Sequence, residues 1–453
     1  MKRRIVGLVL VAALGGCGVL GGGEKPKTPT IGQRIPVLTT EASLEVDAAL
    51  ADIAVIVPPA ETNSAWAQPS GNAAHSIGHV ALPARLSRAW TADIGQGANE
   101  RLRLAAAPVV ADGRVYTVDA SATLRAFDAQ TGAVVWTKPI GTTEARRGGT
   151  DIISGEYTGA RGLLFGGGVS FDGGRVFATS GIGDVAAFNA ATGEEIWRVR
   201  PGGPLRGAPT IANDTVYVVS QDNQIYALAV ADGKLAWSGT STAELAGIIG
   251  AAAPAAAQGT VVAGYSSGEL TAYRYENGRV VWQDALARTS ISTSVGSLSD
   301  IDAEPVIDNG RVYAIGQGGR MVALELNTGQ RIWEINIAGI STPWVAGDWI
   351  FVVTDQAQLL CIARSTGRIR WLAQLPRWRD EEDKEGPIYW NGPILAGDRL
   401  LVVSSDGRIV SAAVADGAVQ STVRADMPVS LPPVVANGTL YLLNERGQLS
   451  AWR

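Results

Sequence analysis

The sequence predicts an all-β protein, an eight-bladed β-propeller made of four-stranded antiparallel blades. Three observations carry this prediction. A Gly–Trp signature recurs along the chain, turn sequences separate strand-like apolar runs before each copy, and the two chain ends together supply one further blade. The 453 residues include 55 glycines, which is typical of a chain with many tight turns.

The Gly–Trp signature is a turn dipeptide that ends in Gly, followed by Trp four residues later. A seventh copy keeps Gly417 but has Ser421 in the Trp position. Because Trp buries a large apolar area, we expect each one to lie on an outer strand, wedged between neighbouring blades. Their spacing around the ring argues against one shared aromatic ligand platform. The complete pairs are Gly132/Trp136, Gly193/Trp197, Gly233/Trp237, Gly278/Trp282, Gly329/Trp333 and Gly367/Trp371.

Three more strand-like runs precede each signature. Within residues 305–334 these runs are separated by Asp-Asn-Gly, Gln-Gly-Gly and Asn-Thr-Gly, which favour tight hairpins. Four antiparallel strands that recur every 40 or so residues are typical of a propeller blade.

Closure of the ring requires the two chain ends to share a blade. Residues 432–453 supply three strands after the seventh unit, and the chain stops without a fourth. Residues 85–95, with Trp90 in the Trp register, precede the first unit. We therefore expect this N-terminal strand to complete the eighth blade, which leaves no free sheet edge between the first and last blades.

The first residues predict an export signal. A basic start (Lys2 to Arg4) precedes a ten-residue apolar core at 5–14, which is shorter than the roughly 20 residues that span a bilayer. The following Leu-Gly-Gly-Cys resembles a bacterial lipobox, so residues 1–16 are expected to be a lipoprotein signal peptide and Cys17 the lipidated residue. An ordinary secretory signal or an uncleaved anchor is the alternative. Gly18 after Cys17 favours the outer membrane, periplasmic side.

The remaining chain divides into a linker and a ring in this interpretation. Residues 17–80 are expected to be a lipidated N-terminus and linker, and residues 81–453 the propeller. The stretch 66–79, with its Trp, Gly-Asn and His, is expected to pack against the ring. The formal net charge of −5 gives no indication of nucleic-acid binding.

Several kinds of chemistry are disfavoured by residue counts. His75 and His79 are the only histidines and both precede the ring, which excludes a His-based metal site or a Ser-His-Asp triad inside it. We expect a structural role for both. Cys361 lies in an apolar run without a disulfide partner, so we expect a buried hydrophobic side chain.

Asp300 and Asp302, in Ser-Leu-Ser-Asp-Ile-Asp-Ala-Glu-Pro (297–305), are the candidate site residues of one loop. Residues two apart in an extended chain share a face. A calcium loop counted from Asp300 fails, because Pro305 and Arg311 stand where Gly and Glu are required. The carboxylates can then receive basic groups of a partner, pair with Arg206, or cap backbone N–H groups in an Asx-type turn.

A second loop, Pro-Leu-Arg-Gly-Ala-Pro (204–209), supplies Leu205 and Arg206. We expect that no strand needs the Leu205 side chain, and that the five-donor fork of Arg206 suits carboxylates at an interface.

Taken together, the lipobox, the propeller repeat and these two loops resemble the BamB family, lipoproteins of the machinery that assembles β-barrel proteins in the Gram-negative outer membrane. The resemblance implies that Leu205, Arg206, Asp300 and Asp302 dock the POTRA domains of BamA. The family pattern often has a Leu where this chain has Gly203. It implies a non-enzymatic scaffold that assists folding and insertion of unfolded outer-membrane proteins, without a cofactor.

Two other functions remain open at this point. The blade repeat also resembles propellers that bind pyrroloquinoline quinone, so a periplasmic quinone-binding enzyme or sensor is the alternative. The dehydrogenases of that family typically carry adjacent cysteines, which this chain lacks. A carbohydrate- or envelope-binding propeller would need clustered aromatic residues, for which Trp378, Tyr389 and Trp390 are the only hint.

Overall fold

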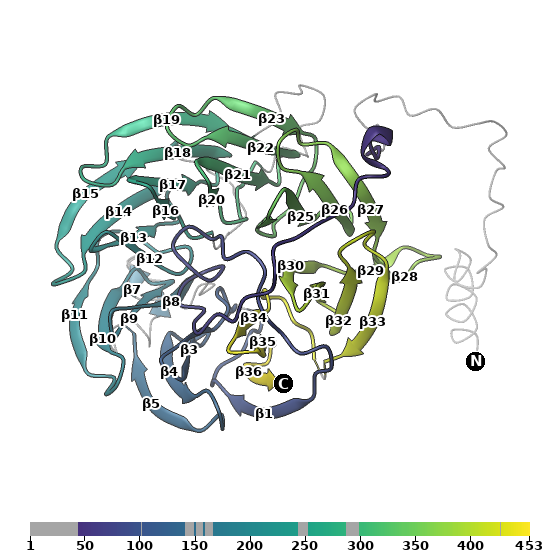
Figure 1. Cartoon of the computed structure of the whole chain (residues 1–453). Coiled ribbons are helices and arrows are strands. Elements are labelled where there is room, and N and C mark those ends of the chain that lie inside the picture. The colour runs from purple at the N-terminus through teal and green to yellow at the C-terminus, as the bar shows by residue number, and fades with distance from the viewer. Residues whose placement is uncertain are drawn as a thin grey trace, which may run out of the picture. The chain divides into compact units, whose positions relative to one another are not determined.

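Residues Val46–Arg453 form one compact unit, a ring of eight four-stranded antiparallel sheets (Figure 1). In the computed structural model the described residues are 44–100, 102–140, 149–150, 157–158, 166–242, 252–286, 299–425 and 427–453. The predicted eight-bladed architecture is confirmed. The predicted signal peptide and Cys17 lie outside the described residues.

The blades follow one another along the chain, each from its innermost to its outermost strand. Blade 1 contains β2 (Val109–Ala111), β3 (Arg114–Val118), β4 (Thr123–Asp128) and β5 (Val134–Pro139), and blade 2 contains β8 (Gly167–Asp172), β9 (Arg175–Ser180), β10 (Val185–Asn189) and β11 (Glu195–Val199). Blade 3 contains β12 (Thr210–Ala212), β13 (Thr215–Val219), β14 (Gln224–Ala229) and β15 (Leu235–Thr240), and blade 4 contains β16 (Ala255–Ala257), β17 (Thr260–Gly264), β18 (Glu269–Arg274) and β19 (Val280–Ala285).

The second half of the ring repeats this order. Blade 5 contains β20 (Val306–Asp308), β21 (Arg311–Gly316), β22 (Arg320–Glu325) and β23 (Arg331–Ile335), and blade 6 contains β24 (Trp344–Ala346), β25 (Trp349–Val353), β26 (Gln358–Ala363) and β27 (Ile369–Gln374). Blade 7 contains β30 (Trp390–Ala396), β31 (Arg399–Ser404), β32 (Arg408–Ala413) and β33 (Val419–Arg424), and blade 8 contains β34 (Val434–Ala436), β35 (Thr439–Leu443), β36 (Gln448–Trp452) and β1 (Arg88–Asp93). Outside the blades lie the 3-10 turn η2 (Ala48–Leu50) and two small pairs, β6 (Gly149–Thr150) with β7 (Tyr157–Thr158) and β28 (Trp378–Asp380) with β29 (Glu385–Pro387).

Strand β1 closes the ring as predicted. It pairs antiparallel with β36, with Trp90 opposite Ala451 and Thr91 opposite Ser450. The N-terminal strand thereby becomes the outer strand of blade 8. The pairing removes the free edge that β36 would otherwise present beside blade 1.

The repeated Trp residues join each blade to the next one. Trp282 illustrates the contact: its indole N–H donates to the carbonyl of Leu326 at 2.7 Å, and its ring lies over Gly329. A Cβ at Gly329 would lie 2.5 Å from the ring, so the turn requires glycine. The same bond, to the residue three before the turn Gly, is made by Trp90, Trp136, Trp197, Trp237, Trp333 and Trp371.

The structure also explains why the seventh signature has no Trp. Each Trp needs the Gly turn between the third and fourth strands of the following blade. Blade 8 has no such turn, because its fourth strand is β1 and comes from the other end of the chain. The position on β33 therefore has no glycine to pack against, and Ser421 is exposed there.

The inner segment, residues Asn63–Val80, crosses the centre of the ring and bonds to all eight innermost strands (Figure 1). Trp66 exchanges backbone hydrogen bonds with Val110 of blade 1, at 2.7 and 2.9 Å. The side-chain amide of Gln68 bonds both to the N–H and to the carbonyl of Ile211 in blade 3, each at 2.9 Å. The contacts in the other blades are with Phe171, Ala256, Ile307, Trp344, Leu395 and Val435. The predicted packing of residues 66–79 against the ring is confirmed.

The structural predictions for His75, His79 and Cys361 also hold. Nδ1 of His75 lies 2.8 Å from the carbonyl oxygen of Pro305, and the buried His79 accepts a hydrogen bond from the backbone N–H of Asp398 at 3.0 Å. Both histidines thus join the inner segment to the ring. Cys361 is fully buried and unpaired, and burial raises the pKa of its thiol.

Candidate functional site

Arg206 lies in the loop that leads into blade 3, and this loop is held by backbone bonds on both sides. The N–H of Arg206 donates to the carbonyl of Val219 in blade 3 at 2.9 Å, and its carbonyl accepts from Gly167 in blade 2 at 3.0 Å. The approach to blade 2 is so close that a Cβ at Gly166 would lie 2.0 Å from the Leu205 carbonyl oxygen. The position of Arg206 is therefore set by two blades.

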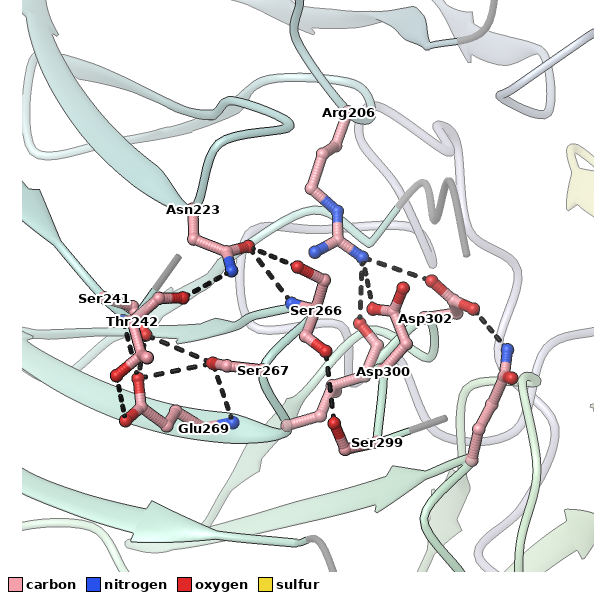
Figure 2. Close-up of polar contacts among 12 residues, drawn as sticks. Arg206, Asn223, Ser241, Thr242, Ser266, Ser267, Glu269, Ser299, Asp300 and Asp302 are labelled. Atoms are coloured by element: carbon pink, nitrogen blue, oxygen red, sulfur yellow. Dashed lines mark hydrogen bonds and ion pairs between the residues drawn. The ribbon is translucent and has the colours of Figure 1, made fainter. Parts of the chain in front are cut away.

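The guanidinium of Arg206 reaches across to the loop that leads into blade 5, as Figure 2 shows. Its Nη2 donates to Oδ1 of Asp300 at 2.8 Å and to Oδ1 of Asp302 at 3.1 Å. The side chains of Arg206 and Asp300 are 2% and 1% exposed, and that of Asp302 is 10% exposed. These three residues, which we call the ion cluster, join two loops that belong to blades two apart.

The Asp300–Asp302 loop is itself held in place by neighbouring backbone and side chains. Ile301 is fully buried, and its N–H donates to the carbonyl of Tyr265 in blade 4 at 3.2 Å. Gln317 donates its backbone N–H to the carbonyl of Asp300 at 2.9 Å and its side-chain amide to Oδ2 of Asp302. The second carboxylate oxygen of Asp302 is thereby also bound.

A second polar network lies beside the ion cluster, in the loops of blades 3 and 4 (Figure 2). Oδ1 of Asn223 accepts from the backbone N–H and the hydroxyl of Ser266, at 3.1 and 2.9 Å. The Ser299 hydroxyl donates to the Ser266 carbonyl at 3.3 Å. This network connects blade 3 through blade 4 to the start of the Asp300 loop.

The charges in the ion cluster do not balance. Two carboxylates face one guanidinium in a site that water scarcely reaches, and burial disfavours a charged carboxylate. Burial, followed by the neighbouring Asp300, raises the pKa of Asp302 to about 7, although Arg206 acts in the opposite direction. A proton on Asp302 would bring the cluster to neutrality.

The position of Leu205 corrects one expectation. The sequence suggested that no strand needs its side chain, but Leu205 is fully buried in a cluster that includes Phe177 of blade 2 and Val218 of blade 3. The loop between these blades directs the Leu205 side chain into this apolar cluster and the Arg206 side chain toward Asp300 and Asp302. Leu205 therefore holds the loop in place and presents no apolar surface.

Of the alternatives left open for the two aspartates, the structure shows the pairing with Arg206. Among the described residues, the hydrogen bonds to the Asp300 and Asp302 carboxylates come from side chains and none comes from a backbone N–H. An Asx-type turn is therefore not formed. The docking role of Leu205, Arg206, Asp300 and Asp302 stays a prediction.

A cavity of about 410 Å³ opens at the centre of the ring, next to the ion cluster. We call it the central cup. The inner segment contributes Trp66, Gln68 and Ser70 to its lining, and the Asp300 loop contributes Asp302 and Glu304. These two carboxylates alternate with the buried Ile301 and Ala303, which agrees with the predicted two-residue period.

Glu304 and Gln317 were not among the site residues predicted from the sequence. Glu304 could have been found, because it lies two residues after Asp302 and so shares its face. Gln317 carries no such signal, since it comes from the turn between β21 and β22 and meets Asp302 only in the folded ring.

The part of the chain that the structure describes contains no group of three His, Cys, Asp or Glu residues arranged to bind a metal ion. In the same ranges, no helix has both the length and the apolar character needed to traverse a lipid bilayer.

Comparison with known proteins gives a consistent family match. The family model described as "Outer membrane protein assembly factor BamB" matches residues 87–161 and 151–373. A curated protein of that name from Yersinia pestis is 25% identical over 373 residues, which cover 81% of this chain and 88% of the relative. The one from Escherichia coli K12 is 26% identical over 363 residues, covering 79% of this chain and 86% of the relative.

Solved structures show the same fold at lower identity. BamB from Moraxella catarrhalis superimposes with a TM-score of 0.66 at 18% identity, covering 82% of this chain and all of that one. A europium-containing methanol dehydrogenase superimposes with a TM-score of 0.64 at 14% identity, covering 84% of this chain and 89% of the enzyme. Both likenesses concern the propeller fold.

Proposed function

The chain belongs to the family of the outer membrane protein assembly factor BamB, and from this premise we propose that it is a non-enzymatic scaffold of the β-barrel assembly machinery. It binds the POTRA domains of BamA and assists the folding and insertion of outer-membrane proteins. The observation that carries this proposal is the ion cluster, which brings together three of the four residues predicted to dock BamA.

The burial of these residues gives them a positioning role in docking. Leu205, Arg206 and Asp300 are hidden, so they act by holding two loops at a defined separation. Asp302 is the member of the group that lines the central cup and lies within reach of a partner. A rigid pair of loops lowers the entropy lost on binding, because the docking surface is formed before the partner arrives.

The non-enzymatic part of the proposal is supported by what occupies the centre of the ring. The inner segment crosses it and bonds to every blade, and the nearby carboxylates are engaged by Arg206, Gln317 and Ser70. The inner segment thus occupies part of the centre, and the carboxylates beside it are held by the chain's own side chains. The quinone-binding alternative rests on a likeness of fold, and a shared fold by itself does not imply a shared function.

Membrane attachment is the second part of the proposal. Cleavage before Cys17 and lipidation of this residue would confine the ring to the periplasmic face of the outer membrane and raise its concentration near BamA. Replacing Cys17 with Ala should move the protein from the outer-membrane fraction to the soluble periplasmic fraction. Unchanged sedimentation with outer membranes, and no lipid mass on the mature N-terminus, would contradict lipid anchoring.

Co-purification with BamA tests the docking site. At about pH 8, above its pKa of about 7, Asp302 is mostly charged. We therefore expect Asp302→Asn to weaken recovery of BamA at that pH by about tenfold, because a charged group at the interface is lost. Asp119→Asn is the matched control. Asp119 also pairs with an Arg side chain, Arg125 at 2.8 Å, but in blade 1, and its side chain is 2% exposed.

Circular dichroism and protease resistance should show that both variants remain folded. The proposal fails if the folded Asp302→Asn protein recovers as much BamA as the Asp119→Asn control does.

A further inference from the structure

The central cup is lined on one side by polar side chains and elsewhere largely by apolar ones. Its apolar part includes Ala106, Val169 and Pro393. On the polar side, Oε2 of Glu304 accepts a hydrogen bond from the Ser70 hydroxyl at 2.5 Å, and the N–H of Glu304 donates to the Thr342 hydroxyl at 3.2 Å. The carboxylate of Glu304 is therefore held in place at the wall.

The charges that line the cup are predominantly negative. Asp302, Glu304 and Glu445 line it, against the single cation Arg103 among the described residues. Within those same residues, Glu304 forms no ion pair with any Lys or Arg side chain. The one guanidinium beside Asp302 is shared with Asp300. A concave surface with this excess of carboxylates attracts a positive charge.

The shape of the cup selects among possible cations. A bare metal ion would need several oxygen ligands, and the described residues offer no such group. The apolar wall suits the aliphatic stem of a Lys or Arg side chain, whose charged end would then reach Asp302 and Glu304. A cavity of about 410 Å³ is large enough for such a side chain.

We propose that the central cup receives a Lys or Arg side chain of a partner protein, whose charge is bound between Asp302 and Glu304. The inference rests on the proposed function, since that function is the reason for assigning the bound cation to a partner protein. It adds the chemistry of recognition, a cationic side chain inserted into the ring. The pKa of Asp302, raised by burial and then by Asp300, should fall when a cation binds beside this carboxylate.

The probe for this proposal is N-acetyl-arginine amide, with N-acetyl-citrulline amide as its neutral counterpart of the same shape. Titration calorimetry with the full chain at physiological salt should show binding of the arginine probe with a Kd of about 1 mM, as expected for a single side chain. The citrulline probe should bind at least about tenfold more weakly, because it lacks the charge-assisted hydrogen bonds.

Variants assign the binding to the cup. Glu304→Gln should weaken binding of the arginine probe by about tenfold, and Glu304→Arg should abolish it, because the chain then supplies its own cation. Glu276→Gln, in an exposed outer turn of blade 4, is the matched control and should bind as the unchanged protein does. Equal binding of both probes, no binding of either, or an unaffected Glu304→Gln variant would overturn the proposal.

Two further results separate this inference from the proposed function. If free arginine binds far more tightly than the capped probe, the guest is a small metabolite and the assignment to a protein side chain is wrong. If the arginine probe binds but Asp302→Asn still recovers BamA, the docking proposal fails while the cationic site stands. If BamA recovery depends on Asp302 but the probe does not bind, the docking proposal stands and the cationic site fails.

Discussion

Replacing Arg206 with Met and replacing Asp302 with Asn should change the stability of the ring in opposite directions. Both substitutions remove one charge from the same ion cluster. Without Arg206, two buried carboxylates face each other with no cation between them. Without the Asp302 charge, Arg206 and Asp300 remain as a balanced pair at 2.8 Å.

The magnitudes follow from burial and from the pKa of Asp302. Removing one partner of a buried pair typically costs about 3–5 kcal/mol, which we expect for Arg206→Met. The pKa of Asp302 is about 7 in the folded ring, against an ordinary value of 3.8 for an aspartate in water. Because the folded state holds the proton more tightly, stability falls as the pH rises from 3.8 towards 7. At about 1.4 kcal/mol per unit, the loss reaches up to about 4 kcal/mol.

Asp302→Asn should therefore equal the unchanged protein near pH 4 and exceed its stability near pH 8. Urea unfolding followed by Trp fluorescence, in a series from about pH 4 to about pH 8, measures both effects. The triple variant Arg206→Met, Asp300→Asn, Asp302→Asn is the control, because a neutral cluster should recover most of the stability lost in Arg206→Met. A destabilised Asp302→Asn protein near pH 8 would refute the reasoning.

Three other predictions concern the frame that holds the site. Gly329→Ala should destabilise the propeller by roughly 2 kcal/mol more than Gly310→Ala in thermal unfolding. Both glycines have a positive φ, but only Gly329 lies against the indole of Trp282. Equal losses of stability would contradict the packing of this Trp against the turn glycine. Gln68→Ala should leave two buried backbone groups of blade 3 unpaired and cost about 2 kcal/mol or more of folding stability. The loss should be seen as faster amide hydrogen exchange in the innermost strand of that blade. Unchanged exchange in this strand would count against the prediction. The Cys361 thiol is buried and has a raised pKa, so it should react with a disulfide reagent only after unfolding. Rapid labelling of the native protein would contradict this and show that strand β26 is open to solvent.

Much of the fold could be predicted because its determinants are local and repeated. The turn glycines and the Trp residues lie four apart in sequence, and each pair marks one blade and its contact with a neighbour. Closure by residues 85–95 could be predicted from counting strands, since an unpaired edge is costly. The sequence shows that Ser421 replaces the expected Trp, but it does not show why. The folded ring gives the reason, because blade 8 offers no glycine turn against which a Trp at this position could pack.

The site was predicted less completely. Arg206, Asp300 and Asp302 were identified from two short loops, whereas Glu304, two residues after Asp302, was not included among the site residues. The burial of Leu205 and the contact of Gln317 with Asp302 were not foreseen. Both depend on which side of a loop faces a neighbouring blade, and sequence spacing within one blade carries no information on that.

The architecture follows from local features of the sequence, since hairpin turns, strand period and the Gly–Trp signature each act over a few residues. The site exists only in the folded ring, because Arg206 meets Asp300 and Asp302 across 94 and 96 residues of chain. The closed ring also fixes the path of the inner segment, which bonds to all eight blades and lines one side of the central cup. Contacts of this kind arise from the closure of the ring, which places distant loops around one axis. The polar groups of these loops are then buried away from water, so they are stable only when they bond to one another.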